Sequence, residues 1–242
     1  MLALVIAPRG PGGALLTAVR LPVQLKLERT RLRLGRRRVA LLCYSLFANR
    51  EYRMPQPTLR PQDVLVLVKL LSYEGRRPPM AQMGLELSIS SSEVHAALKR
   101  LVLSKLVSSD ANGNRPILKA AEEFLLHAVK YAFPARRGEV TRGVPTSYAA
   151  PPLNKEIELG SELPPVWPFP EGQHRGVSLE PLYKTAPAAA LRDPVFYEML
   201  ALIDALREGR ARERKLAEKE LIERVRRQLH ERPESPPPGS RR

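Results

Sequence analysis

Apolar residues recur at helical spacing in several separate stretches of the chain, and residues 88–107, SISSSEVHAALKRLVLSKLV, show this pattern most clearly. Ser90 and Glu93 are three residues apart, the spacing of a capping box, so we predict that a helix begins there. Apolar side chains then follow at intervals of three and four residues, which predicts one buried face. The buried face would consist of Val94, Ala97, Leu98 and Leu101, and the outward face of Ser91, Ser92, His95, Ala96, Lys99 and Arg100.

Two helices are predicted before this one. Pro61 suits the first position of a helix that ends near Gly75, and this stretch is apolar on nearly all sides, so it should be largely buried. Pro78 and Pro79 cannot lie inside a helix and therefore mark a loop. A short helix over about residues 80–87 follows, so that three helices are expected in succession.

A β-hairpin and a further helix are predicted after residue 104. Asn112–Gly113 suits a tight turn between two short apolar runs, and Pro116 limits the second strand to the edge of a sheet. The stretch AAEEFLLHAVKYAF then has the pattern of a helix. Its inward residues would be Phe124, Leu125, Ala128, Val129 and Ala132. This part of the chain is therefore predicted to be mainly α-helical with one small β-hairpin.

Proline is concentrated in the next segment, where nine of the 24 prolines lie in residues 134–185. We predict a Pro-rich extended arm over residues 134–187. Disordered linkers seldom contain such aromatic residues as Trp167, Phe169 and Tyr183, so the rings should pack on a surface of this chain or of another.

A helical pair is predicted over residues 188–232. Asp193 is placed to cap its first helix, Pro194 occupies the first position, and Gly209 ends it. The second helix carries dense opposite charges beside an apolar stripe, with Glu220 and Arg224 at a favourable spacing of four. The two helices suit docking or dimerisation. Residues 233–242 are predicted to be a disordered tail.

The order helix, short helix, helix, hairpin, helix is that of a winged helix-turn-helix. PQDVLVLVKLLS together with MAQMGLELSISSSEVHAALKRLVLSKLV resembles the DNA-binding core of MarR-like bacterial transcriptional regulators, over about residues 59–120. The positions that match the family's recognition-helix pattern are Ser91, Val94, Leu98, Leu101 and Leu106–Val107. The resemblance implies a winged helix-turn-helix domain over residues 54–133 that binds double-stranded DNA.

Six residues are the candidate DNA contacts. Side chains near the start of a recognition helix face base edges, and cations farther along it face phosphates. Ser91, Ser92 and His95 are therefore expected at base edges, Lys99 and Arg100 at phosphates, and Arg115 in the wing. Residues 59–119 hold nine basic and five acidic side chains, so one copy should bind weakly and a homodimer is expected.

Charge is distributed unevenly along the chain. The formal net charge is +15, which favours a polyanionic partner, but residues 1–53 alone hold eleven basic and two acidic residues. We interpret residues 1–53 as a basic extension that is disordered or lies outside the functional protein, which would begin at Met54; an organellar transit peptide is the alternative. Cys43 is the single cysteine, so an intramolecular disulfide is excluded and a cytoplasmic location is expected.

Motifs of catalysis are missing from the sequence. It contains no glycine-rich phosphate loop, no HExxH and no group of histidines at metal-ligand spacing, so we expect no enzyme, no cofactor and no metal site. No run of about 18 apolar residues is present, so no membrane span is expected. The alternative to a DNA-binding regulator is a protein-interaction module or antitoxin-like protein that binds a protein partner through residues 134–232.

Overall fold

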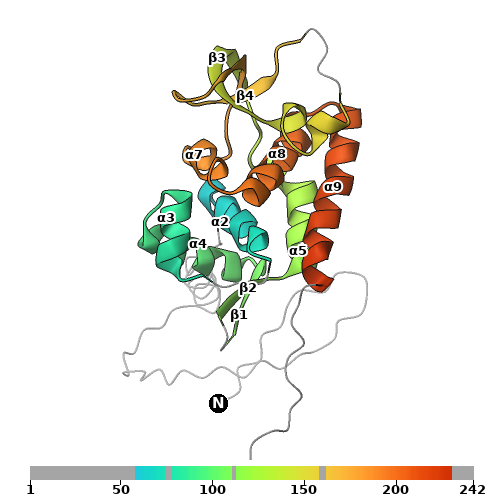
Figure 1. The fold of residues 1–242 in the computed structure, drawn as a ribbon. Helices are drawn as coiled ribbons and strands as arrows, with labels where there is room; N and C mark the ends of the chain where they lie inside the picture. The colour runs from blue at the N-terminus through green and yellow to red at the C-terminus, as the bar shows by residue number, and fades with distance from the viewer. Residues whose placement is uncertain (1–57, 75–77, 111–112, 158–161, 231–242) are drawn as a thin grey trace, which may run out of the picture. The chain divides into compact units, whose positions relative to one another are not determined.

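The computed structural model describes residues 58–74, 78–110, 113–157 and 162–230, which all belong to one compact unit (Figure 1). The predicted extension over residues 1–53 and the predicted tail over residues 233–242 lie outside the described residues. The described chain is mostly helical, with one antiparallel two-stranded hairpin and one three-stranded sheet. Among its helices none is both long and apolar enough to cross a lipid bilayer.

Three helices and a hairpin come first, as the sequence pattern predicted. They are α2 (Pro61–Ser72), α3 (Met80–Leu87), α4 (Ser91–Leu103), β1 (Val107–Asp110) and β2 (Gly113–Pro116). The predicted capping box is confirmed: Glu93 N donates to Ser90 Oγ at 3.2 Å, and Ser90 N donates to Glu93 Oε2 at 3.0 Å. β1 and β2 pair only with each other among the described strands, so Pro116 lies in an edge strand as expected.

The core of this region lies between α2 and α4. Val94, Ala97, Leu98 and Leu101 are all buried, which confirms the predicted inward face of α4. On α2 every residue from Asp63 to Lys69 is buried, because α3 and α4 cover it on one side and α8 (Pro194–Glu208) on another. This first helix is therefore the central element around which the other helices pack.

The helix after the hairpin contains an irregular turn. It runs through α5 (Leu118–Glu123), a π-helical segment (Phe124–Ala128) and α6 (Val129–Ala132). Leu125 and Val129 are buried as predicted, but Leu126 is buried as well and Ala132 is exposed. The prediction that Ala132 points inward was therefore wrong, because the wider π turn shifts the buried face relative to regular α-helical spacing.

The Pro-rich segment folds rather than remaining an extended arm. Its strands are β3 (Arg137–Pro145), β4 (Pro165–Pro168) and β5 (His174–Leu179), which close on one another, followed by α7 (Ala186–Ala190). Two short 3-10 helices, η2 (Ser147–Ala149) and η3 (Leu153–Lys155), connect β3 with β4. The backbones inside the closed sheet approach closely: a Cβ on Gly143 would lie 1.9 Å from the carbonyl oxygen of Trp167. Only glycine fits there.

The sheet is fastened to α8 through a buried carboxylate. Asp204 accepts hydrogen bonds from Trp167 Nε1 at 2.6 Å, Thr146 Oγ1 at 2.9 Å and Arg207 at 2.6 Å. Trp167 therefore packs on this same chain, against α8. Burial raises the pKa of Asp204, although the Arg207 guanidinium acts in the opposite direction.

The C-terminal helices match the prediction closely. Asp193 caps α8 by accepting from Phe196 N at 3.1 Å, Pro194 is its first residue, and Gly209 follows its end. The apolar stripe of α8 is buried throughout: Phe196, Met199, Leu200, Ile203 and Leu206. The last helix, α9 (Ala211–His230), packs along α8, and its Arg224 pairs with Glu220 and with Glu198 of α8.

Candidate nucleic-acid interface

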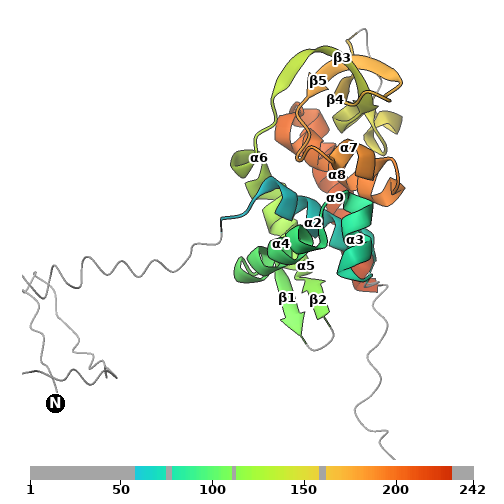
Figure 2. The same cartoon turned by 90° about the vertical axis from the view of Figure 1, so that its left-hand side faces the viewer.

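The outward face of α4 presents four of the predicted contact residues together. Ser91, Ser92, His95 and Lys99 are all exposed. His95 follows Ser91 by four residues and Ser92 by three, and Lys99 follows His95 by four, so the four side chains form one row along the helix. Figure 2 shows α4 beside the β1–β2 hairpin at one end of the compact unit. We refer to these four side chains as the α4 row.

The N-terminal end of the α4 row is held by the helix cap. Glu93 accepts hydrogen bonds from both Ser90 N and Ser90 Oγ at 3.0 Å, and the backbone hydrogen bond lowers the pKa of this carboxyl. Ser90 Oγ also lies 2.9 Å from Ser92 Oγ. Glu93 is thus occupied within the protein, and its charge is directed to the cap rather than to the outward row.

Arg100 does not belong to this row, in contrast to the sequence-based expectation of a phosphate contact. Its Nε donates to Asp63 Oδ2 at 2.7 Å and a terminal nitrogen donates to Asp63 Oδ1 at 2.6 Å, a bidentate pair that joins α4 to α2. Asp63 is fully buried, and the hydrogen bonds that Arg100 donates to this carboxylate raise the pKa of Arg100. The guanidinium therefore holds the two helices together and leaves Lys99 as the cation of the row.

Arg115, the predicted wing residue, lies in β2 opposite Ser108 and is partly buried. Its Nε atom is buried and has no hydrogen-bond partner among the described residues. Sequence reasoning missed a second cation on this side: Lys105 is exposed in the turn between α4 and β1, with a left-handed φ of 57°. The position of Lys105, directly after the predicted recognition helix, is the sequence signal that could have identified this lysine.

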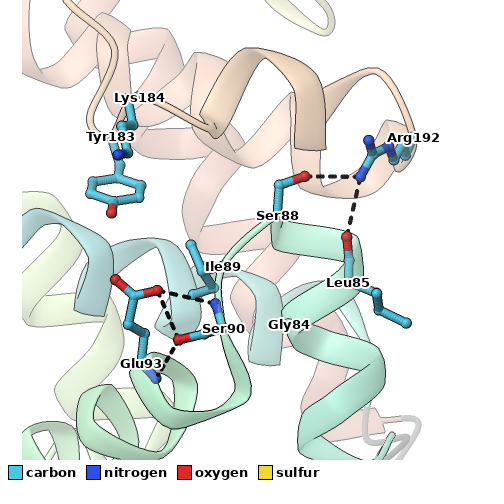
Figure 3. Close-up of a pocket in the computed structure, with 9 residues that line it drawn as sticks. All are labelled: Gly84, Leu85, Ser88, Ile89, Ser90, Glu93, Tyr183, Lys184 and Arg192. Carbon is cyan, nitrogen blue, oxygen red and sulfur yellow. Dashed lines mark hydrogen bonds between the residues drawn. The ribbon is translucent and has the colours of Figure 1, made fainter.

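A hollow of about 510 Å³ lies next to the start of α4 (Figure 3). The turn between α3 and α4 forms one wall, and Tyr183, Lys184 and Arg192 line the other. Arg192 donates to the carbonyl oxygen of Leu85 at 3.2 Å and to Ser88 Oγ at 3.0 Å. The turn between the two helices is thus held from outside by a residue that precedes α8.

In the part of the chain that the structure describes, no three His, Cys, Asp or Glu side chains come together to bind a metal ion. No family model, curated protein or solved structure matches the chain. The α4 row is therefore interpreted from its own geometry and chemistry.

Proposed function

We propose that the protein is a sequence-specific, double-stranded-DNA-binding transcriptional regulator in which α4 is the recognition helix of a winged helix-turn-helix. The observation that carries this proposal is the division of α4 into two faces. Val94, Leu98 and Leu101 are buried against the other helices, whereas the α4 row is exposed with the β1–β2 hairpin beside it. The order α2, α3, α4, β1, β2, α5 supports the proposal, because a winged helix-turn-helix domain would have its elements in this order.

The chemistry of the α4 row suits the major groove. Serine hydroxyls and the imidazole can donate or accept hydrogen bonds at base edges, and the first backbone N–H groups of a helix bind phosphate. Lys99 lies one turn beyond His95 on the same row, where it can reach the DNA backbone. Ser91, Ser92 and His95 would therefore select the sequence, and Lys99 would contribute to binding at any site.

The small number of free cations supports a dimer. Arg100 is paired with Asp63, which leaves Lys99 as the exposed cation of the α4 row, with Lys105 in the turn that follows the helix. A subunit that neutralises few phosphates binds DNA weakly and with a shallow salt dependence. Two copies on a palindromic site would double both the contacts and the salt slope, so we include a homodimer in the proposal.

The test is a binding-site selection from random DNA duplexes, followed by anisotropy titrations with the selected duplex and with the DNA upstream of the gene. We expect wild-type protein to enrich a palindromic sequence. Lys99→Ala should weaken binding to all duplexes and lower the salt slope by about 1 per subunit.

Lys155→Ala is the matched control, because Lys155 is also exposed but lies on η3, away from α4. This variant should bind like the wild type. A protein that enriches no sequence, or a Lys99→Ala variant that binds every duplex as the wild type does, would refute the assignment of α4 as the recognition helix.

A further inference from the structure

Two arginines face each other across the small sheet. In the antiparallel pairing of β3 with β5, Arg142 lies directly opposite Arg175, and both are exposed. In an antiparallel strand pair, the side chains of directly opposed residues project from the same face of the sheet, with their Cβ atoms about 5 Å apart. Neither guanidinium has a hydrogen-bond or ion-pair partner among the described residues. We call Arg142 and Arg175 the arginine pair.

Such an arrangement costs stability unless an anion lies between the charges, since like charges directly opposite each other in a sheet repel. The sheet cannot relax easily, because β3, β4 and β5 close on one another around Gly143 and Gly176, where a Cβ would meet backbone atoms. The backbone positions that carry the two arginines are therefore held opposite each other, so both guanidinium groups can reach the same acidic segment, and each can bind a carboxylate in a bidentate pair.

We propose that the arginine pair is a docking site for an acidic segment of a protein partner. Val140, which is 45% exposed, lies opposite Val177. This valine pair is two residues away from the arginine pair along the strands and on the same face of the sheet, so the site combines two cations with apolar surface. Arginine beside exposed apolar side chains is typical of protein interfaces.

The site is separate from the proposed DNA interface. Figures 1 and 2 both show the β3–β5 sheet at the opposite end of the compact unit from the β1–β2 hairpin. A duplex bound at α4 would leave the arginine pair free, so the protein could hold DNA and a protein partner together. Because the sheet is closed, the partner would bind through side chains rather than by adding a strand.

The test uses the full chain and a fluorescein-labelled peptide in which Glu and Val alternate. In anisotropy titrations, Arg142→Glu/Arg175→Glu should weaken peptide binding about tenfold or more, since losing one charge-assisted hydrogen bond already has an effect of this size. The same variant should gain affinity for a Lys–Val peptide. Its affinity for a DNA duplex should stay within about twofold of that of a control with the same change in net charge.

The matched control is Arg212→Glu/Arg214→Glu, because these two arginines are exposed on α9. This control should keep the peptide affinity of the wild type. Equal weakening in both variants would mean non-specific attraction and would overturn the proposal, as would undetectable peptide binding by the wild type. A loss of duplex binding larger than the loss of peptide binding would assign the pair to nucleic acid instead. Because failure at α4 would leave the peptide titration unaffected, the two proposals can fail independently.

Discussion

Lys69 Nζ on α2 lies 2.7 Å from Asp193 Oδ2, the carboxylate that caps α8, and only 3% of the lysine side chain is exposed. The same ammonium lies 2.7 Å from Glu86 Oε2 on α3 and sits over the rings of Tyr73 and Phe196. One buried cation thus joins α2, α3 and α8. The helices of the proposed DNA-binding region and the C-terminal helices therefore share one core, although the sequence suggested separate segments.

Replacement of Lys69 by Met should lower the free energy of unfolding by about 1–3 kcal/mol, because the partly buried carboxylates of Asp193 and Glu86 would lose their shared cation. Chemical denaturation followed by circular dichroism measures this loss. Lys99→Met, a change at an exposed lysine, should stay within about 0.5 kcal/mol of the wild type. Similar losses in the two variants would contradict the role of Lys69.

Stability should decrease in acid through this same cluster. Burial is the largest single influence and would raise the pKa of Asp193 and of Glu86, but the hydrogen bonds that each carboxylate accepts and the charge of Lys69 together outweigh it, so both pKa values lie below their ordinary 3.8 and 4.5. A lowered folded-state pKa stabilises the folded protein above the ordinary pKa, and the contribution disappears as the pH falls through the lowered value.

Melting temperatures of the wild type and Asp193→Asn, measured across this acid range, check the pH dependence. The wild type should exceed the variant above about pH 4, and the difference should shrink with acidification as Asp193 becomes protonated in the wild type. Asn can still accept the hydrogen bond from Phe196 N, so a difference in melting temperature that stays constant with pH would contradict a contribution from the charge of Asp193.

Arg100 should matter for stability rather than for direct contact with DNA. Arg100→Met would leave the buried carboxylate of Asp63 unpaired and cost about 3–5 kcal/mol, whereas Asp63→Leu/Arg100→Met removes both charges and should recover most of this loss. Denaturation curves of the two variants provide the comparison. The folded double variant should bind the selected duplex like the wild type. A tenfold loss of affinity would instead indicate that Arg100 contacts DNA.

Ser92→Ala and His95→Ala should change which sequences are preferred. A lost base contact costs about 1–3 kcal/mol at the cognate base and little elsewhere, so discrimination at that position should weaken. Competition titrations with duplexes altered one base pair at a time measure this effect. Gln173→Ala, an exposed change on the segment between β4 and β5, serves as control. If the sequence preferences of both α4 variants match those of the wild type, Ser92 and His95 do not contact base edges.

Much of the helical architecture was predictable because its signals are local. The capping box of Ser90 and Glu93, the proline at position 61 and the cap at Asp193 each act within one helical turn, so the spacing of a few residues determines where α4, α2 and α8 begin. The apolar periodicity of α4 likewise identified its buried face, because residues three and four apart lie on the same side of a helix.

Side-chain partners, by contrast, depend on tertiary structure. Arg100 follows the same outward pattern as Lys99, yet it pairs with Asp63, 37 positions away, and Lys69 meets Asp193 across 124 positions. Local spacing carries no information about such contacts, which form only when helices pack. The sequence alone determined the helices α2, α3, α4 and α8, the β1–β2 hairpin and the buried face of α4; only the tertiary structure decided that the Pro-rich segment closes into a sheet, which cations face solvent and which hold the core together.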